Sequence, residues 1–337
     1  MTPIEPMEAL LAKELPDGPG WQYEPKWDGF RCIAIRSGAD VQLWSKSGKP
    51  LARYFPEVAA MVGRLDAREF ILDSELLIVS RGIVSFEALQ LRLHPAETRV
   101  RKLAAATPAM MMAFDLLALG KEMHGSKPLS KRRAVLEKML AGEREADLQL
   151  SPATRDRDEA LGWLERTGGA LDGVIAKRLD LPYRPGERAM VKVKQRRTAD
   201  CVVGGFRYAS KGRQVGSLLL GLYDDAGLLN HVGYTSSIAA RDRADWTREL
   251  EALVEPPGFT GSAPGGPSRW ATARSAEWQP LKPAIVVEVL YDQVTGGRFR
   301  HGTKLLRRRP DKSPRQCTME QLAPPLTPSQ LKQLMIG

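Results

Sequence analysis

The 337-residue sequence predicts an α+β protein with two domains, residues 1–197 and 198–337. Apolar, strand-like runs alternate with segments of helical spacing through the first part, whereas short strands separated by turn residues dominate the second. Between them, residues 195–200 are polar and show no period, which predicts a linker. A chain of this length is long for one hydrophobic core and suits two.

The first part begins with a predicted hairpin, strands 31–36 and 41–44 around a Ser-Gly-Ala-Asp turn. Further along, periodicity predicts helices at residues 56–65, 131–140 and 158–167, and strands at residues 70–79, 110–119, 172–177 and 190–194. The last of these strands alternates apolar with basic residues, so Lys192 and Lys194 are expected on one face.

The second part is predicted to be mostly β-strand. Strands are expected at residues 201–208, 216–223, 228–234 and 284–291, with one helix at residues 241–253. A loop rich in Gly, Pro and Ser follows that helix, at residues 256–268. About five strands with one intervening helix suit a small Greek-key barrel of the OB type.

Composition narrows the classes of partner and compartment. The net charge of +10 favours an acidic partner, most simply nucleic acid. No apolar stretch has membrane-spanning length and the N-terminus lacks a secretion signal, so we expect a cytoplasmic protein without membrane contact. Cys32, Cys201 and Cys317 are odd in number and far apart, which leaves neither a disulfide framework nor a zinc site.

Lys26 is the strongest candidate for covalent chemistry. It stands in Glu24-Pro25-Lys26-Trp27-Asp28-Gly29-Phe30-Arg31, where Gly29 permits close backbone approach to a ligand and Arg31 offers a planar fork for phosphate or ribose oxygens. A nucleophilic amine must be unprotonated when it attacks. The pattern Lys-x-Asp-Gly-x-Arg resembles motif I of the covalent nucleotidyltransferases, which include DNA ligases, RNA ligases and capping enzymes. Taken by itself, the same residue could be a surface lysine in a turn.

Further segments resemble the later motifs of this family, in the same order. Each also has an ordinary structural explanation: a solvent-facing acid, a core aromatic, a solvated strand face or a basic surface patch. The matching residues are Glu75 in Asp73-Ser74-Glu75 (motif III), Phe114 (motif IIIa), Asp172 in Asp172-Gly173-Val174-Ile175-Ala176-Lys177 (motif IV), Lys192 and Lys194 (motif V), and Arg309, Asp311 and Lys312 (motif VI).

The resemblance extends from Glu24 to Lys312 and is nearest to the short bacterial ATP-dependent DNA ligases of the LigC and LigD-ligase-domain type. Arg53-Tyr54-Phe55-Pro56-Glu57 is also typical of these enzymes, and Lys46 in Ser45-Lys46-Ser47-Gly48 would belong to motif Ia. The resemblance implies a nucleotidyltransferase (adenylation) domain of antiparallel sheets with flanking helices, followed by an OB-fold β-barrel.

The resemblance also implies a role for each residue. Lys26 would carry AMP from ATP to the 5′-phosphate of a nick, which the 3′-hydroxyl then seals. The remaining residues fall into four groups: nucleotide binding by Glu24, Arg31, Glu75, Phe114, Lys192 and Lys194; Mg²⁺ or Mn²⁺ binding by Asp172 and Glu75; orientation of the leaving pyrophosphate by Arg309, Asp311 and Lys312; and contact with DNA by Asp28, Lys46 and Arg53.

Four positions depart from the usual family pattern. Asp172 stands where glutamate is normal, Ser74 where glycine is common, Lys46 where arginine is frequent and Met190 where an aromatic often precedes motif V. The shorter Asp172 side chain puts the strength of metal coordination in question, and a lysine at position 46 neutralises a phosphate without the bidentate fork of arginine.

Two other functions stay open at this point. An RNA ligase or capping-type guanylyltransferase uses the same catalytic domain, and a non-catalytic OB protein would bind nucleic acid without forming a covalent adduct. ATP is expected rather than NAD because the cysteine-rich zinc module of NAD-dependent ligases is missing. We expect a monomer acting on nicked double-stranded DNA in a bacterial nucleoid, in DNA repair, with any repair polymerase or end-binding protein supplied in trans.

Overall fold

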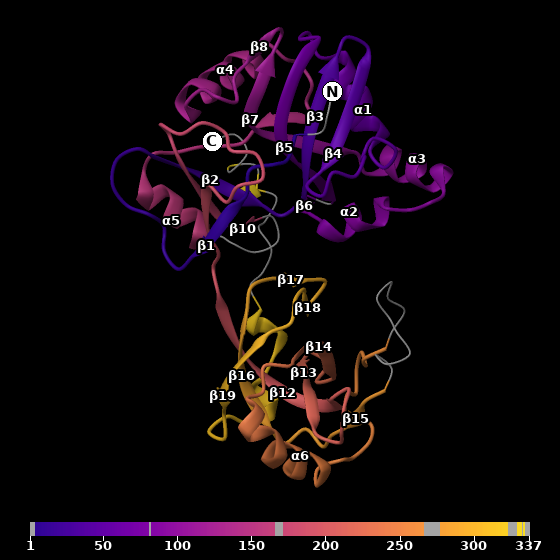
Figure 1. Cartoon of the computed structure of the whole chain (residues 1–337). Coiled ribbons are helices and arrows are strands. Elements are labelled where there is room, and N and C mark those ends of the chain that lie inside the picture. Colours follow the sequence, from indigo (N-terminus) through magenta and orange to yellow (C-terminus); the bar gives the residue numbers. More distant parts are fainter. Residues whose placement is uncertain are drawn as a thin grey trace. The chain divides into compact units, whose positions relative to one another are not determined.

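A computed structural model describes residues 4–80, 82–165, 171–265, 277–322, 329–331 and 333. By internal contacts the chain forms two compact units, Met1–Gln195 with Pro325–Gly337, and Arg196–Pro324. Figure 1 labels the helices and strands of both units. The sequence predicted the domain boundary between residues 197 and 198, two residues later than this division, and it assigned the C-terminal residues to the second domain.

A large, mainly antiparallel sheet forms the body of the first unit. Its strand order is β4-β3-β5-β7-β8, and two short strands pair at its sides, β6 with β5 and β9 with β7. The bounds are β3 (Phe30–Ser37), β4 (Asp40–Ser45), β5 (Glu69–Ser80), β6 (Ile83–Val84), β7 (Ala109–Leu119), β8 (Glu122–Met123) and β9 (Leu148–Leu150). The predicted hairpin is confirmed, because Ser37 pairs with Asp40 across the turn between β3 and β4.

Helices cover this sheet and the smaller one beside it. Their bounds are α1 (Pro56–Arg64), α2 (Phe86–Arg92), α3 (Glu97–Ala106), α4 (Leu129–Ala141) and α5 (Arg157–Glu165). The apolar side of α1 packs Val58, Met61 and Val62 into the sheet core, as helical spacing requires. α2 and α3 were not expected from the sequence. No helix in the described ranges has the length and apolar composition that crossing a bilayer demands.

A second, four-stranded sheet carries Lys26, Asp172 and Lys192 of the candidate site. Its order is β1-β11-β10-β2, with bounds β1 (Ala9–Ala12), β2 (Trp21–Trp27), β10 (Leu171–Arg178) and β11 (Met190–Val193). β1 runs parallel to β11, and the other pairs are antiparallel. Leu331, near the C-terminus, is buried in the same core as Tyr23, Trp27 and Trp163. Leu331 thus belongs to the core of the first unit.

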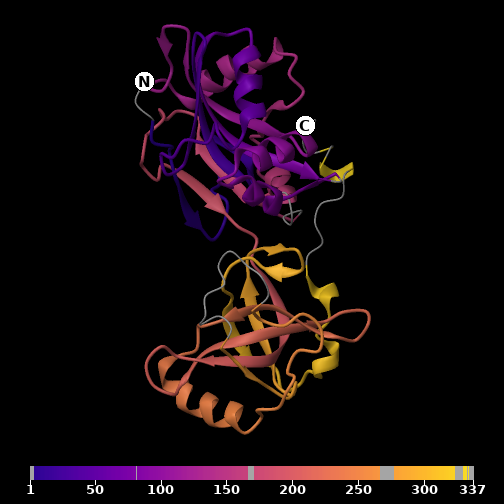
Figure 2. The ribbon, with the colours of Figure 1, turned by 90° about the vertical axis from the view of Figure 1, so that its right-hand side faces the viewer.

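The second unit is the predicted OB-type barrel, and this part of the fold prediction is confirmed. Five strands follow the order β14-β13-β12-β16-β19, and Thr235 at the end of β14 makes a parallel bridge with Thr303, beside β19. The bounds are β12 (Arg197–Tyr208), β13 (Val215–Tyr223), β14 (Leu229–Thr235), β15 (Gln279–Pro280), β16 (Val286–Tyr291), β17 (Val294–Thr295), β18 (Arg298–Phe299) and β19 (Lys304–Arg308). Between β14 and β15 in the sequence lies α6 (Arg243–Glu251), the orange helix beside the barrel strands in Figure 2. Its Trp246 and Leu250 are buried in the core of the barrel.

One element prediction was wrong. The supposed linker at residues 195–200 is strand from Arg197 onward, because β12 pairs Ala199 with Val289 and Asp200 with Glu288. Its polar character misled the prediction, since a buried carboxylate is unusual in a barrel strand. Asp200 is only 8% exposed, and three side chains of the barrel satisfy its oxygens and backbone.

Candidate active site

Lys26 lies at the end of β2 and points toward a carboxylate on the neighbouring strand. Its Nζ donates to Oδ2 of Asp172 over 2.5 Å, and Lys194, one residue past β11, donates to the same oxygen over 3.0 Å. Asp172 is 9% exposed, so one nearly buried carboxylate oxygen serves two ammonium groups. Three adjacent strands of one sheet therefore bring together residues that are far apart in sequence.

Gly173 explains why Asp172 can reach this position. The pairing of β10 with β2 shifts register between Leu171 and Gly173, which leaves Asp172 in a bulge. Gly173 has φ of +138°, and a Cβ there would lie 2.0 Å from the carbonyl oxygen of Val193. Only glycine permits this approach of β10 to β11, and the bulge turns the Asp172 carboxylate toward Lys26 and Lys194.

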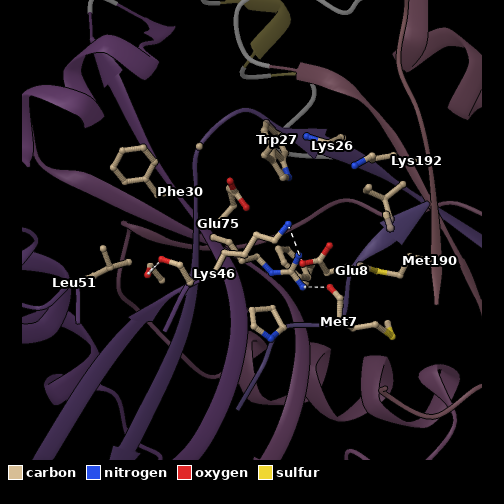
Figure 3. A pocket seen from close by; sticks show the side chains of 18 of the residues that line it. Met7, Glu8, Lys26, Trp27, Phe30, Lys46, Leu51, Glu75, Met190 and Lys192 are labelled. Atoms are coloured by element: carbon tan, nitrogen blue, oxygen red, sulfur yellow. Dashed lines mark hydrogen bonds and ion pairs between the residues drawn. The ribbon is translucent and has the colours of Figure 1, made fainter. Parts of the chain in front are cut away.

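A cavity of about 940 Å³ opens beside Lys26, between the two sheets (Figure 3). This volume is in the range of small-molecule sites in proteins. Among the predicted residues, those that line it are Glu24, Lys26, Arg31, Lys46, Glu75, Phe114 and Lys192. Ile175 and Met190 add apolar surface, and the latter occupies the position where an aromatic was expected. The lining of the cavity thus combines apolar side chains with several cationic ones.

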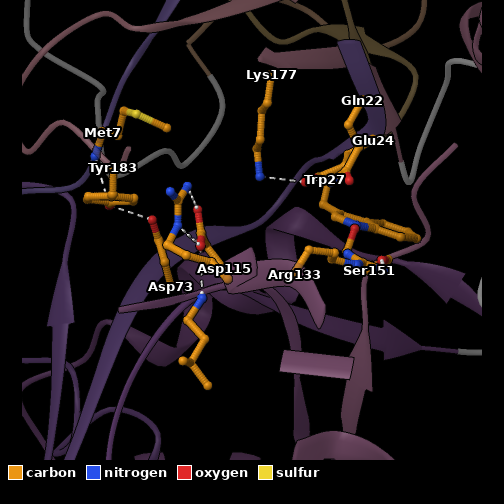
Figure 4. A network of polar contacts seen from close by, with 12 residues as sticks. Met7, Gln22, Glu24, Trp27, Asp73, Asp115, Arg133, Ser151, Lys177 and Tyr183 are labelled. Carbon is orange, nitrogen blue, oxygen red and sulfur yellow. Dashed lines mark hydrogen bonds and ion pairs between the residues drawn. The ribbon is translucent and has the colours of Figure 1, made fainter. Parts of the chain in front are cut away.

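Phe114 on β7 and Arg31 on β3 meet in the wall of this cavity. The Arg31 guanidinium lies 4.7 Å from the ring centroid of Phe114, and Lys177 Nζ lies 4.6 Å from it. Arg31 makes a bidentate pair with Asp73, each bond 2.5 Å long. Asp73 is fully buried and also accepts from the Tyr183 hydroxyl over 2.6 Å (Figure 4). This network fixes the Arg31 side chain.

Glu24 and Lys177 form a buried ion pair in the cavity wall. Lys177 Nζ lies 2.7 Å from Oε2 of Glu24, while Gln22 donates to Oε1 over 2.8 Å (Figure 4). The sequence pattern marks Lys177 as the end of motif IV, but it indicated no role for this residue. The available signal was a lysine directly after the apolar residues Val174, Ile175 and Ala176 of the strand, where burial requires a partner.

Glu75 on β5 lies opposite Arg31 and lines the cavity. Burial raises the pKa of Glu75 to about 7, although the charges of Arg31 and Lys26 act in the opposite direction. Beside it, Ser74 is buried and its hydroxyl donates to the Cys32 carbonyl over 2.7 Å. The serine that replaces the usual glycine is therefore accommodated within the sheet.

The carboxylates present fit one mode of metal binding. Within the described ranges, no group of three or more His, Cys, Asp or Glu side chains is arranged to hold a metal ion. Mg²⁺ is commonly held by one or two carboxylates, with phosphate oxygens and waters as the other ligands. Asp172 beside Lys26 and Glu75 in the cavity suit that mode. Asp28, in the turn between β2 and β3, is close enough to Glu75 to raise its pKa further.

The predicted DNA-contacting residues are separated. Lys46 follows β4, lines the cavity and pairs with Glu8 over 3.0 Å. Arg53 is not among the residues lining that cavity. Its Nη2 donates to the Pro95 carbonyl over 3.1 Å, and it borders a separate cleft of about 490 Å³ along α3. The structure thus does not bring Arg53 together with Lys26.

The motif VI residues cluster around Asp200 in the second unit. Arg309 Nη1 lies 2.9 Å from Oδ1 of Asp200, and Lys312 Nζ lies 2.7 Å from Oδ2. Asp311 pairs with Arg309 from the other side over 2.9 Å. These interactions hold the two cations in a fixed arrangement at the end of β19, and Asp200 was missed because it fell in the supposed linker.

Comparison with known families matches most of the chain. Residues 5–194 match the family described as ATP dependent DNA ligase domain, and residues 211–312 match ATP dependent DNA ligase C terminal region. DNA ligase C2 of Mycolicibacterium smegmatis is 46% identical over an alignment covering 96% of each chain. DNA ligase C of Mycobacterium tuberculosis is 43% identical, covering 98% of this chain and 96% of that one.

Solved structures agree with these matches. A mycobacterial DNA ligase D complexed with ATP and MES is 27% identical, with a TM-score of 0.50, covering 94% of this chain and 98% of that one. A Lig E DNA ligase is 17% identical with a TM-score of 0.53, covering 90% and 99%, and supports the fold alone. With family matches over both units and relatives above 40% identity along nearly the whole sequence, this chain belongs to the ATP-dependent DNA ligase family.

Proposed function

We propose that this ligase seals nicks in duplex DNA through a lysyl-AMP intermediate on Lys26. Lys26 Nζ attacks the α-phosphorus of ATP, a P–N bond forms, and the bond to pyrophosphate breaks. The AMP then passes to an oxygen of the 5′-phosphate at the nick, which breaks the P–N bond and restores the lysine. Finally the 3′-hydroxyl attacks that phosphate and AMP leaves. The main support is the placement of Lys26 against Asp172 and Lys194 beside a cavity of nucleotide size.

The residues around Lys26 supply orientation and charge. An N–H of Lys26 directed at Asp172 leaves the nitrogen lone pair aimed away from that carboxylate and available for attack. Lys192 and Lys194 provide positive charge where the α-phosphate becomes more negative in the transition state. We assign the purine to Phe114 and Glu24, and the ribose to Arg31 and Glu75.

Asp172 and Glu75 are the residues we assign to Mg²⁺ or Mn²⁺. When bound, the metal supplies charge neutralisation at the phosphates as pyrophosphate departs. Asp172 also compensates the charges of Lys26 and Lys194, so only part of its negative charge is available to a metal. We therefore expect phosphate oxygens of the nucleotide to complete the coordination.

Arg309, Asp311 and Lys312 are assigned to orientation of the pyrophosphate during lysine adenylylation. Asp28, Lys46 and Arg53 are assigned to DNA, and the charge of +10 supports a grip on the backbone that weakens as salt rises. Because Arg53 borders a cleft away from Lys26, its contact would fall further along the duplex.

The same proposal covers the cellular setting. We assign the chain a monomeric, cytoplasmic role in DNA repair on nucleoid DNA, with polymerase or end-binding proteins as separate partners. The repair role is supported by similarity to relatives whose names include DNA repair, among them a Multifunctional non-homologous end joining DNA repair protein LigD of Mycobacterium tuberculosis that is 32% identical over 89% of this chain and 37% of that protein.

Labelling with α-³²P-ATP or α-³²P-GTP tests the nucleophile directly. The protein, first treated with pyrophosphate to remove bound AMP, is incubated with label and Mg²⁺ and run on a denaturing gel. We expect label from ATP alone, lost in Lys26→Ala and kept in Lys13→Ala, an exposed lysine outside the cavity lining. Label from GTP would indicate capping chemistry, and label retained in Lys26→Ala would overturn the assignment. Sealing of a nicked duplex by the wild type then tests the acceptor.

A further inference from the structure

Glu8 is a carboxylate in the cavity wall that none of the assignments above uses. It stands just before β1, and its backbone is fixed to the segment leading into β11. Its N–H donates to the Glu187 carbonyl over 2.8 Å, and its own carbonyl accepts from the Met190 N–H over 3.1 Å. The position of Glu8 is therefore set by the sheet that also carries Lys26 and Lys192.

Cations surround the Glu8 side chain. Lys46 Nζ lies 3.0 Å from Oε1 and Arg188 Nε lies 3.9 Å from Oε2. The hydrogen bond and charge of Lys46, with the charges of Arg188 and Lys192, lower the pKa of Glu8, so it is ionised at neutral pH. Figure 3 shows the Lys46 side chain reaching Glu8, the one residue following β4 and the other preceding β1.

The contact between Glu8 and Lys46 is exposed and therefore easy to break. The Lys46 side chain is 61% exposed and that of Glu8 is 32% exposed. Exposed ion pairs contribute little to stability, and they are screened by salt. By contrast, Lys177 and Glu24 in the same cavity are 4% and 3% exposed. The pair at the rim is thus suited to open and close while the buried pair is not.

We propose that Glu8 is a resident counter-ion for Lys46, a positioning residue that holds this ammonium in the DNA-free enzyme and is replaced by a DNA phosphate when the nick binds. The inference rests on the proposed function in one respect, the assignment of Lys46 to DNA. The Glu8 carboxylate stays close to the phosphate that replaces it, so its negative charge weakens DNA binding. Because Lys46 exchanges one anionic partner for another, it contributes to DNA affinity only the difference between its interaction energies with the phosphate and with Glu8.

The test measures binding of a fluorescent nicked duplex by anisotropy, without ATP or metal so that no chemistry occurs. Glu8→Gln keeps the shape of the side chain and removes its charge. Glu5→Gln is the matched control, because Glu5 is an exposed acid of the same segment that lies over Gly186 and away from Lys46. We expect Glu8→Gln to bind about two- to fivefold more tightly at low salt, with Glu5→Gln close to wild type and Glu8→Asp intermediate.

A double-mutant cycle separates the pair from a general charge effect. In a Lys46→Ala background, Glu8→Gln should lose most of its effect on DNA affinity. In the Lys46-containing protein, Glu8→Gln should also steepen the dependence of log K on log salt by about one counter-ion. Equal effects of Glu8→Gln and Glu5→Gln, an unchanged effect without Lys46, or weaker binding by Glu8→Gln would each overturn the inference.

Two further readouts keep failure of the counter-ion role distinct from failure of the proposed function. If the wild type does not form lysyl-AMP or seal a nick, the proposed function fails. If it does both and Glu8→Gln binds DNA like wild type, only the counter-ion role fails. A Glu8→Gln variant with changed KM for ATP and unchanged DNA affinity would assign Glu8 to the nucleotide instead.

Discussion

Oδ2 of Asp172 lies 2.5 Å from Lys26 Nζ, and the same atom is the acceptor for Lys194. A single carboxylate oxygen thus sits between two strands that each bring an ammonium group. Asp172 therefore has two effects: it fixes the position of the Lys26 amine, and it compensates part of the positive charge of Lys26 and Lys194. The shorter aspartate, in place of the usual glutamate, reaches both lysines because the bulge before Gly173 carries it toward them.

Asp172→Asn is expected to slow lysyl-AMP formation by about a hundredfold. The amide keeps an acceptor but has no charge, so Lys26 and Lys194 lose their shared counter-ion and any metal loses an anionic ligand. Single-turnover labelling at saturating ATP and Mg²⁺ measures the effect. Asp172→Glu restores the charge and should retain more activity than the asparagine variant; equal rates in the two variants would argue against a role for that charge.

Gly173→Ala is expected to lower thermal stability by several degrees and to abolish adenylylation. The added Cβ would meet the Val193 carbonyl oxygen at 2.0 Å, in a conformation with φ of +138° that L-residues avoid. Gly38→Ala is the matched control, because Gly38 also has positive φ but a Cβ added there would meet no atom within 4 Å. Thermal unfolding compares the two variants, and Gly173→Ala should lose more stability because it has both the steric clash and the larger strain. Equal losses would show that strain alone is responsible.

The local pattern of the sequence predicted several elements well. Alternation and turn residues were sufficient for the hairpin of β3 and β4 and for β12, β13 and β14 of the barrel, since these pairings are close in sequence. The structure also places Lys26 beside Asp172, the residues that resemble motifs I and IV, on the neighbouring strands β2 and β10. The roles assigned to these residues stay predictions.

The features that the sequence did not predict are contacts between residues far apart along the chain. β1 joins β11 across most of the first unit, and nothing local marks Glu8 as part of the cavity. Tyr183 and Lys177 were passed over because their partners, Asp73 and Glu24, are more than a hundred residues away. Buried ion pairs of this kind leave no periodic signal, because a single charged residue in a strand resembles a solvent-facing one.

The raised pKa of Glu75 predicts a pH effect on both activity and stability. The ratio of lysyl-AMP formation rates, wild type over Glu75→Gln at subsaturating ATP, should rise as pH increases through about 7, because ribose or metal binding uses the ionised carboxylate. Taking the ratio cancels those pH effects that do not involve Glu75. A ratio that does not change between pH 6 and 8.5 would contradict the assignment of ionised Glu75 to the nucleotide.

The stability effect has the opposite direction. Because folding raises the pKa of Glu75 above its usual 4.5, the folded state binds this proton more tightly than the unfolded state. The contribution of protonated Glu75 to the free energy of unfolding is therefore complete below pH 4.5 and is lost as pH rises through about 7. Relative to wild type, Glu75→Gln should gain stability between pH 5 and 8 in urea unfolding of the nucleotide-free protein.

Asp200 provides a prediction that separates the steps of the reaction. Its carboxylate holds Arg309 and Lys312 at 2.9 and 2.7 Å, and these cations are assigned to the pyrophosphate, which is present only during lysine adenylylation. Asp200→Asn removes the charge that orients them while keeping the size of the side chain. Hydrogen bonds to charged groups contribute about 1.5–3 kcal/mol, so misplaced cations should slow self-adenylylation on the order of tenfold or more.

The same variant should seal a pre-adenylylated nick at close to the wild-type rate, since no pyrophosphate takes part in that step. Single-turnover assays with ATP and with the pre-adenylylated duplex give the two rates from one preparation. Asp311→Asn is the comparison, because Asp311 pairs with Arg309 from the exposed side and is expected to have a smaller effect. If Asp200→Asn slowed both steps equally, the residue would serve the barrel's structure as a whole, and the link between Asp200 and the leaving group would be lost.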